Sequence, residues 1–305
     1  MAGKFLLTFT DADTNCNQIL NSYEDAQFVN PVRDKPVKRA KTGEEGDWYN
    51  SIAFGDQAKR LPKPFLFSIR PSDEHANAKS ARKISRLLTL YDNAGESFLP
   101  GRDTAVNQVT RHLSKYDALM FLYDPTQNPV FREECSKISR DPQVHDVEIN
   151  AVQERIFHEV ASRIRRHKGL GETEKCREPI IVVVTKCDIW APLIKNLPLQ
   201  PPWVETQSFG GHAINTNIVE QVSDVVRKLL LRFSPELVRS VDGFSDKVLY
   251  VPVSATGVSP TRVRTSDGQS VVGGICPGDI KPIWVEVPLI YTLAKWQDYV
   301  IPVKS

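Results

Sequence analysis

Four short apolar runs, separated by longer polar and amphipathic segments, constrain the fold of this chain most strongly. They are RLLTLYD (86–92), YDALMFLYDP (116–125), PIIVVVTKCD (179–188) and KVLYVPVSATG (247–257). Each run is short, rich in apolar residues and closed by turn-forming residues, a pattern typical of buried parallel strands. We therefore predict four strands, with polar loops at their carboxyl ends.

Two segments between these strands are predicted to be amphipathic helices. They are 144–168 and 217–233, where apolar residues recur at three- and four-residue spacing. The alternation of strands and helices favours an α/β fold with a mostly parallel sheet and helices on both faces. The run PFLFSIRP (64–71) and the run 86–92, separated by a long polar connection, are predicted to form a hairpin, which adds one antiparallel strand beside the parallel set.

The strands that carry polar loops are interleaved with helices, so we predict a single domain over residues 1–305 with its core at 64–297. Residues 1–63 are polar, charged and broken by proline, which predicts loops, partial order or the remainder of a truncated N-terminal region. Residues 189–246 form a candidate insertion that could dock a partner.

Composition excludes several classes of function. A formal net charge of +2 in 305 residues argues against nucleic acid or an anionic membrane as the main partner. The five cysteines are scattered without metal-ligand spacing, which favours a reducing compartment, and we expect the cytoplasm. No apolar stretch approaches the ~20 residues that a transmembrane helix needs.

The end of the first apolar run carries residue types that suit magnesium and phosphate. Asp92 could hold Mg²⁺ through water, because this ion keeps several waters and binds few protein carboxylates. Gly95, three residues later, would let its backbone N–H approach a γ-phosphate. Glu96 would then lie where a residue that orients water is expected in GTP hydrolysis, and it is the candidate catalytic residue.

The ends of the third and fourth runs suit a guanine base. Asp188 could accept hydrogen bonds from guanine N1 and N2, a donor pair that adenine lacks. Lys186, after Thr185, could lay its aliphatic stem along the base. Ser254 and Ala255 begin a small turn that could contact guanine O6.

Each of these motifs also has an ordinary structural explanation. Asp92 and Gly95 can form a simple turn, and the TKCD motif at 185–188 can be a helix N-cap after a strand. The order of the motifs, each after its own strand, favours the nucleotide site. An unrelated doubly wound domain with chance motifs instead predicts that Asp92, Asp188 and Ser254 do not converge in space.

The stretches LYDNAGESF, VVVTKCD and VPVSATG together resemble the motifs of P-loop GTPases. The YDNAGESF stretch followed by HLSKYDALMFLYDP, and the tail IKPIWVEVPLIYTLAKW, are similar to the bacterial double-GTPase group. The resemblance implies a Ras-like fold. It assigns Asp92 and Gly95 to magnesium and phosphate, and Lys186, Asp188, Ser254 and Ala255 to guanine.

The chain departs from that family at the phosphate loop. It contains no GxxxxGKS or GxxxxGKT, and Gly3-Lys4 is followed by Phe5. We therefore expect the family's first strand and its phosphate (Walker A) loop to be missing from this chain. Thr185 replaces the usual asparagine, and Glu96 is an acid where many relatives have glutamine. No clear switch threonine can be assigned, although Thr42 is a candidate.

These features predict a GTP-binding, GTPase-like molecular switch that uses GTP or GDP with Mg²⁺ and contacts an unidentified protein partner. Without a phosphate loop, hydrolysis is expected to be impaired unless an upstream segment supplies the loop. The alternative is a catalytically inactive pseudo-GTPase that acts as a protein-interaction scaffold.

Overall fold

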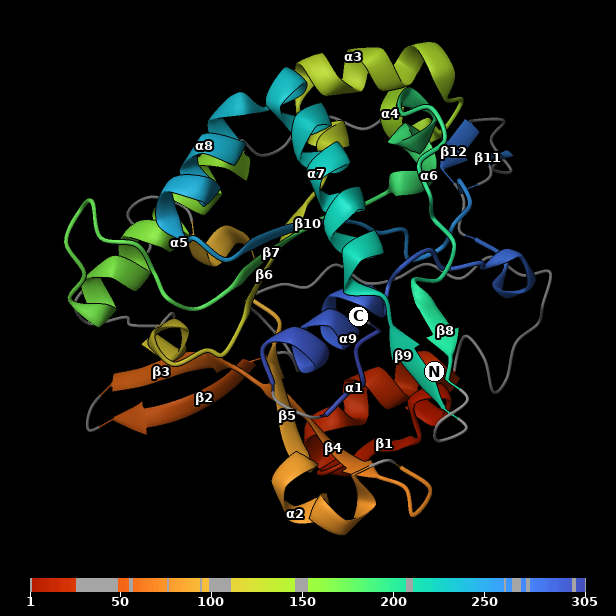
Figure 1. The fold of residues 1–305 in the computed structure, drawn as a ribbon. Helices are drawn as coiled ribbons and strands as arrows, with labels where there is room; N and C mark the ends of the chain where they lie inside the picture. The colour runs from red at the N-terminus through yellow and green to blue at the C-terminus, as the bar shows by residue number, and fades with distance from the viewer. Residues whose placement is uncertain are drawn as a thin grey trace.

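The fold is taken from a computed structural model. It describes residues 2–25, 49–54, 57–75, 77–93, 95–98, 111–145, 153–206, 211–260, 262–264, 270–272, 275–297 and 300–304. The described chain is mixed α/β (Figure 1), with one three-stranded parallel sheet, one three-stranded antiparallel sheet and three two-stranded pairs.

The parallel sheet has the strand order β10-β7-β6. Its strands are β6 (Leu119–Tyr123), β7 (Ile180–Val184) and β10 (Val248–Pro252). Every residue of β7 is buried, because this strand has a hydrogen-bonded neighbour on both sides. Three of the four predicted parallel strands are thus confirmed.

Helices α5 (Gln153–Lys168) and α8 (Pro235–Phe244) cover one face of the parallel sheet. Phe121 of β6 meets Phe157 of α5 edge to face, with ring centroids 5.1 Å apart. The hydroxyl of Tyr250 in β10 donates to Asp242 of α8 over 2.9 Å. The predicted helix at 217–233 is α7 (Thr216–Phe233), while residues 146–152 of the other predicted helix lie outside the described residues.

The strand at 86–92 forms the predicted antiparallel hairpin with 64–71, but it is not part of the parallel sheet as predicted. It forms β5 (Arg86–Tyr91), which is antiparallel to β4 (Pro64–Pro71) and does not join the parallel sheet. The connection contains only η3 (Ala78–Ser80) and α2 (Ala81–Ile84), too little for a crossover between parallel strands. β5 is also largely exposed, with Leu87 at 64% and Tyr91 at 45% of full exposure.

Parts of residues 1–63, which are predicted to be loops or partly ordered, form regular elements. Leu7–Asp11 forms β1, which pairs antiparallel with β4, so the sheet order is β1-β4-β5 rather than one antiparallel strand beside the parallel set. Asp13 caps α1 (Thr14–Glu24) by accepting from two backbone N–H groups. Buried Asn17 bonds both the N–H and the C=O of Leu66 at 2.8 Å, which fixes α1 on β4.

The remaining elements are short connections and pairs, which are described here by their bounds alone. They are η1 (Ala2–Phe5), β2 (Tyr49–Phe54), β3 (Gln57–Pro62), η4 (Gly95–Phe98), η5 (Arg111–Ser114), η6 (Pro125–Gln127), α3 (Pro129–Ile138), α4 (Pro142–His145), α6 (Cys187–Trp190), η7 (Ala191–Leu193), β8 (Trp203–Glu205), β9 (His212–Ile214), β11 (Arg262–Arg264), β12 (Ser270–Val272), η8 (Pro277–Asp279) and α9 (Val287–Lys295).

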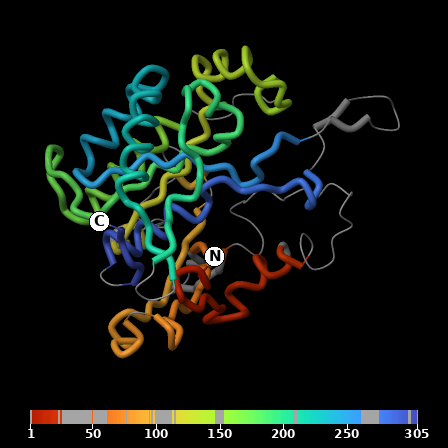
Figure 2. The backbone as a smooth tube through the Cα atoms, turned by 45° about the vertical axis from the view of Figure 1, so that its right-hand side comes forward, coloured from red at the N-terminus to blue at the C-terminus, as the bar shows by residue number. Residues whose placement is uncertain are grey.

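One buried apolar cluster runs through both three-stranded sheets. It extends in sequence from Phe5 to Ile301, and α9 lies between the parallel and antiparallel strands in Figures 1 and 2. The segment 189–246, considered as an insertion, contains α7 and α8, whose apolar faces belong to this cluster. The described residues therefore pack around a continuous core.

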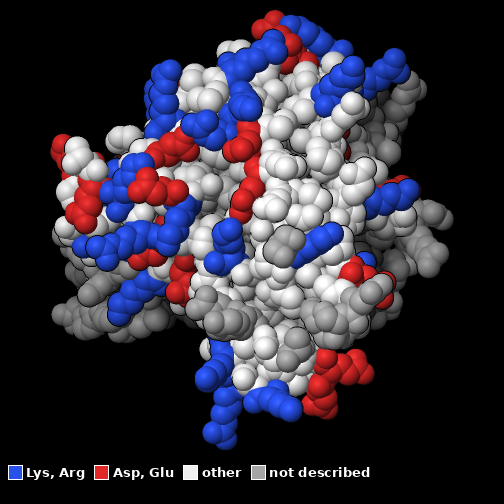
Figure 3. Space-filling model, viewed as in Figure 1, with Lys and Arg blue, Asp and Glu red and all other residues white. Residues whose placement is uncertain are grey.

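Charge is distributed without large single-sign areas on the face shown in Figure 3. Lysine and arginine are interspersed there with aspartate and glutamate, and the centre of this face is mostly uncharged. In the part of the chain that the structure describes, no helix combines the length and apolarity needed to cross a bilayer.

Candidate functional site

The carboxyl ends of the three parallel strands meet at one edge of the sheet. In the strand register, Tyr123 of β6 lies opposite Val184 of β7, which lies opposite Pro252 of β10. The loops that begin at Asp124, Thr185 and Val253 therefore leave the sheet side by side. Ligands of open α/β sheets bind at such an edge.

The loop Thr185–Asp188 is fixed to both neighbouring strands. The backbone N–H and hydroxyl of Thr185 donate to the carbonyl of Tyr123 over 2.8 and 3.0 Å. The N–H of Cys187 donates to the carbonyl of Val253 over 3.1 Å. The indole of Trp190 donates to the Thr185 carbonyl over 2.8 Å, which closes the first turn of α6. These bonds give the Thr185–Asp188 loop a defined path.

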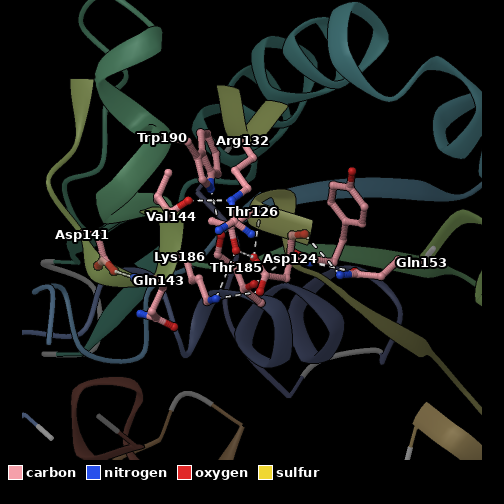
Figure 4. Close-up of polar contacts among 11 residues, drawn as sticks. Asp124, Thr126, Arg132, Asp141, Gln143, Val144, Gln153, Thr185, Lys186 and Trp190 are labelled. Atoms are coloured by element: carbon pink, nitrogen blue, oxygen red, sulfur yellow. Dashed lines mark hydrogen bonds and ion pairs between the residues drawn. The ribbon is translucent and has the colours of Figure 1, made fainter. Parts of the chain in front are cut away.

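Lys186 has a left-handed backbone, with φ 54° and ψ 40°. For a residue with a Cβ this conformation costs about 1 kcal/mol relative to a right-handed one. Its ammonium group forms an ion pair with Asp124, at 2.7 Å between Nζ and Oδ2, and donates to Thr126 Oγ1 over 3.2 Å (Figure 4). The lysine side chain therefore spans the ends of β7 and β6.

Asp124 is itself held in place. Its Oδ1 accepts from the N–H and hydroxyl of Thr126 over 2.9 and 2.7 Å. Its backbone N–H donates to Gln153 Oε1 over 2.9 Å, and Gln153 Nε2 donates back to its carbonyl over 3.2 Å. Asp124 and Lys186 are partly buried, with side-chain exposures of 22% and 27%.

The interior of the loop contains an unreactive thiol. Burial, followed by the nearby charge of Asp188, raises the pKa of Cys187 to about 12, so it stays protonated near neutral pH. Asp188 is half-buried and follows Cys187 in α6. The thiol thus supports packing, and Asp188 beside it is partly exposed.

The loop from Ser254 to Gly257 lies next to the Thr185–Asp188 loop, through the hydrogen bond from Cys187 N–H to the Val253 carbonyl. Ser254 is buried and pairs with Ile283 through two backbone hydrogen bonds of 3.0 and 2.8 Å. Its hydroxyl accepts from the N–H of Gly257 over 2.8 Å. Ala255 between them is exposed.

The predicted magnesium and phosphate residues lie after a strand of the other sheet. Asp92 follows β5 directly and is exposed, and Gly95 begins η4 with open space where a Cβ would lie. The side chain of Glu96 is not among the described side chains, and Thr42 lies outside the described residues. The convergence of Asp92 with Asp188 and Ser254 therefore remains a prediction.

One observation on the described residues concerns the magnesium prediction. Within the described residues, no three His, Cys, Asp or Glu side chains gather in a way that could hold a metal ion. Mg²⁺ bound to a nucleotide needs only one or two carboxylates beside phosphate oxygens and water, so Asp92 alone would suffice.

Two residues of this region were not identified from the sequence. Asp124 and Thr126 contact Lys186 only because β6 and β7 are neighbours, and strand adjacency cannot be obtained from either run alone. The available signal was the aspartate that ends the run 116–125, at the same strand-end position as Asp92.

Comparisons with protein-family models, with curated proteins and with solved structures give no match for this chain.

Proposed function

We propose that this chain is a GTPase-like protein that binds guanine nucleotide and acts as a molecular switch. The observation that carries the proposal is the hydrogen bond from Cys187 N–H to the Val253 carbonyl. It places the Thr185–Asp188 loop beside the Ser254–Gly257 loop, at the sheet edge where nucleotides bind in α/β folds. The two loops that the sequence assigned to the base are thus neighbours.

The chemistry of these loops suits guanine better than adenine. Asp188 offers a carboxylate to the N1 and N2 donors of guanine, a pair that adenine does not have. The backbone N–H of Ala255, an exposed residue, can donate to a carbonyl such as O6. A hydrogen-bonding site of this kind discriminates strongly, because the wrong base leaves a charged group without its partner.

Phosphate binding is the weak part of the proposed site. Asp92 would hold Mg²⁺, Gly95 would contact the γ-phosphate and Glu96 would orient water, as in GTP hydrolysis. The sequence contains no GxxxxGKS or GxxxxGKT. We therefore expect weak nucleotide affinity and slow hydrolysis. In this proposal, the exchange of GTP for GDP changes how well the loops after Asp92 are ordered.

The second candidate function is a pseudo-GTPase scaffold in the cytoplasm that binds a protein and no nucleotide. One observation favours it. The Lys186 ammonium is already satisfied by Asp124 and Thr126, so the loop has a stable arrangement without ligand.

Binding of fluorescent GDP and GTP analogues with Mg²⁺ separates the two candidates. We expect saturable binding that Asp188→Ala weakens at least tenfold, because a hydrogen bond to a charged group contributes about 1.5–3 kcal/mol. Asp117→Ala is the matched control, since Asp117 is exposed just before β6, at the opposite end of that strand. An ATP analogue should not compete.

Equal loss of affinity in both variants, or competition by ATP, would contradict a guanine site at Asp188. A folded protein that binds none of these nucleotides would support the scaffold.

A further inference from the structure

The conformation of Lys186 is unusual enough to need a local cause. A lysine in the left-handed region is strained, and glycine or asparagine would be the ordinary choice there. Such strain persists only where surrounding contacts fix it, and it often marks functional loops. The contacts that fix Lys186 therefore also set the conformation of the Thr185–Asp188 loop.

The side-chain contacts of Lys186 come from the end of the neighbouring strand β6. Nζ lies 2.7 Å from Asp124 Oδ2 and 3.2 Å from Thr126 Oγ1. Thr126 is fully buried and bonds Asp124 Oδ1 twice, so the carboxylate cannot turn away. Figure 4 shows Lys186 extended toward these two residues. The lysine therefore meets a rigid partner.

We infer that Asp124 is a positioning residue for the proposed guanine site. Its carboxylate fixes Lys186, and the fixed Lys186 sets the left-handed turn that leads into α6, which contains Asp188. This inference rests on the proposed function for its ligand.

The same ion pair assigns a role to the charge of Lys186. Because Asp124 neutralises the ammonium group, Lys186 does not act on a ligand as a free cation. It contributes its aliphatic stem, along which a base can lie. Its contribution is thus to the base and not to the phosphates.

A double-mutant cycle tests this arrangement. The variants are Asp124→Asn, Lys186→Met and both together. The matched control is Asp117→Asn, because Asp117 is exposed and precedes the amino end of β6. Asparagine keeps the oxygen that caps Thr126 and removes only the charge. If the fold does not tolerate it, Asp124→Ser keeps a capping oxygen as well.

Two readouts are measured, and the first needs no nucleotide. We expect Asp124→Asn to speed acylation of the Lys186 amine and amide hydrogen exchange over residues 185–189, and Asp117→Asn to change neither. The second readout is the affinity for a fluorescent GDP analogue. Asp124→Asn should weaken it about tenfold, because a charge-assisted bond is lost. The double variant should bind no more weakly than Lys186→Met alone, because Asp124 acts through Lys186.

The outcomes distinguish this inference from the proposed function. If the unmodified chain binds no GDP, the proposed function fails, and the acylation and exchange rates still decide whether Asp124 fixes the loop. Unchanged rates in Asp124→Asn overturn the inference. If GDP binds, additive losses in the cycle, or an affinity of Asp124→Asn equal to that of Asp117→Asn, also overturn it.

Discussion

Gly257 is the residue whose backbone most restricts substitution near the candidate site. It has φ +67°, and a Cβ built there would lie 1.9 Å from the backbone carbonyl oxygen of Lys281. The backbone N–H of Lys281 donates to the carbonyl of Thr256 over 2.7 Å, so the segment around Lys281 cannot move away freely. The turn after Ser254 therefore depends on glycine at this position.

We expect Gly257→Ala to lower the free energy of unfolding by about 2 kcal/mol or more, through strain and a backbone clash. Gly243→Ala is the control, because Gly243 lies in α8 with open space around it. That variant should gain about 0.5–1 kcal/mol from helix propensity. Urea unfolding of both variants measures the difference. Equal stability would show that the turn can relax.

Glu178 is the second residue with a predicted, measurable contribution to stability. Burial alone would raise its pKa, but hydrogen bonds from Cys176 and Lys168 and the charge of Lys168 outweigh it and lower the pKa to about 2. The carboxyl group is thus held ionised beside a half-buried cluster that includes Tyr116. Because the folded pKa lies below the ordinary value of 4.5, this stabilisation is present above pH 4.5.

Glu178→Gln should therefore cost about 1 kcal/mol at pH 7, allowing for solvent screening at this partly exposed group. The difference from the unmodified protein should shrink as pH falls from about 4.5 to 2, because the native carboxylate becomes protonated. Denaturant unfolding across this pH range measures it, with exposed Glu172→Gln as the control. A difference that does not change with pH would refute the proposed cause.

At the scale of elements, α5 anchors η4, which carries Gly95. Arg163 of α5 is almost fully buried and pairs with Glu159 at 2.8 Å. It donates to the Ser97 carbonyl over 2.7 Å, and its guanidinium lies 5.5 Å from the Phe98 ring centre. The segment after Asp92 is thus attached to a helix that covers the parallel sheet.

Arg163→Met should keep the apolar stem and remove the donors to η4. We expect faster amide exchange over residues 95–98 and a loss of about 2 kcal/mol in stability, because buried acceptors lose a charged partner. Arg155→Met, an exposed site on the same helix, should change neither quantity. Unchanged exchange at η4 would show that other contacts hold this segment.

Elements with a clean apolar pattern were predictable from the sequence, and elements that depend on partners were not. The run at 180–184 and the helix at 216–233 have unbroken patterns, so their structure follows from local physics. β1 has the sequence LTFTD with four of five residues exposed, so its pairing with β4 leaves little trace in composition. The contact of Lys186 with Asp124 needed the strand order, which local patterns do not contain.

At the scale of the whole molecule, two strand edges are exposed and apolar. Among the described strands, β6 pairs only with β7, and β5 pairs only with β4. Leu122 of β6 is 65% exposed and Leu87 of β5 is 64% exposed. Unpaired apolar edges of this kind promote association of chains.

We expect Leu122→Lys to reduce self-association at high protein concentration without lowering stability, because the side chain is already exposed. Val130→Lys, at a 57% exposed site in α3, is the control and should leave association unchanged. Light scattering over a concentration series measures both. An equal effect of the two lysines would indicate that net charge, and not the strand edge, controls association.

The register of the parallel sheet also sets how this chain can fold during synthesis. Leu119 pairs with Ile180, and Ile180 pairs with Val248, so β6 and β7 each wait for a partner more than sixty residues later in the chain. Contacts between residues so far apart in sequence form slowly. Until they form, the unpaired apolar strands can associate with the wrong partners. The central strand β7 has both neighbours only after β10 has left the ribosome. The core and the candidate site are therefore completed late in synthesis of the chain.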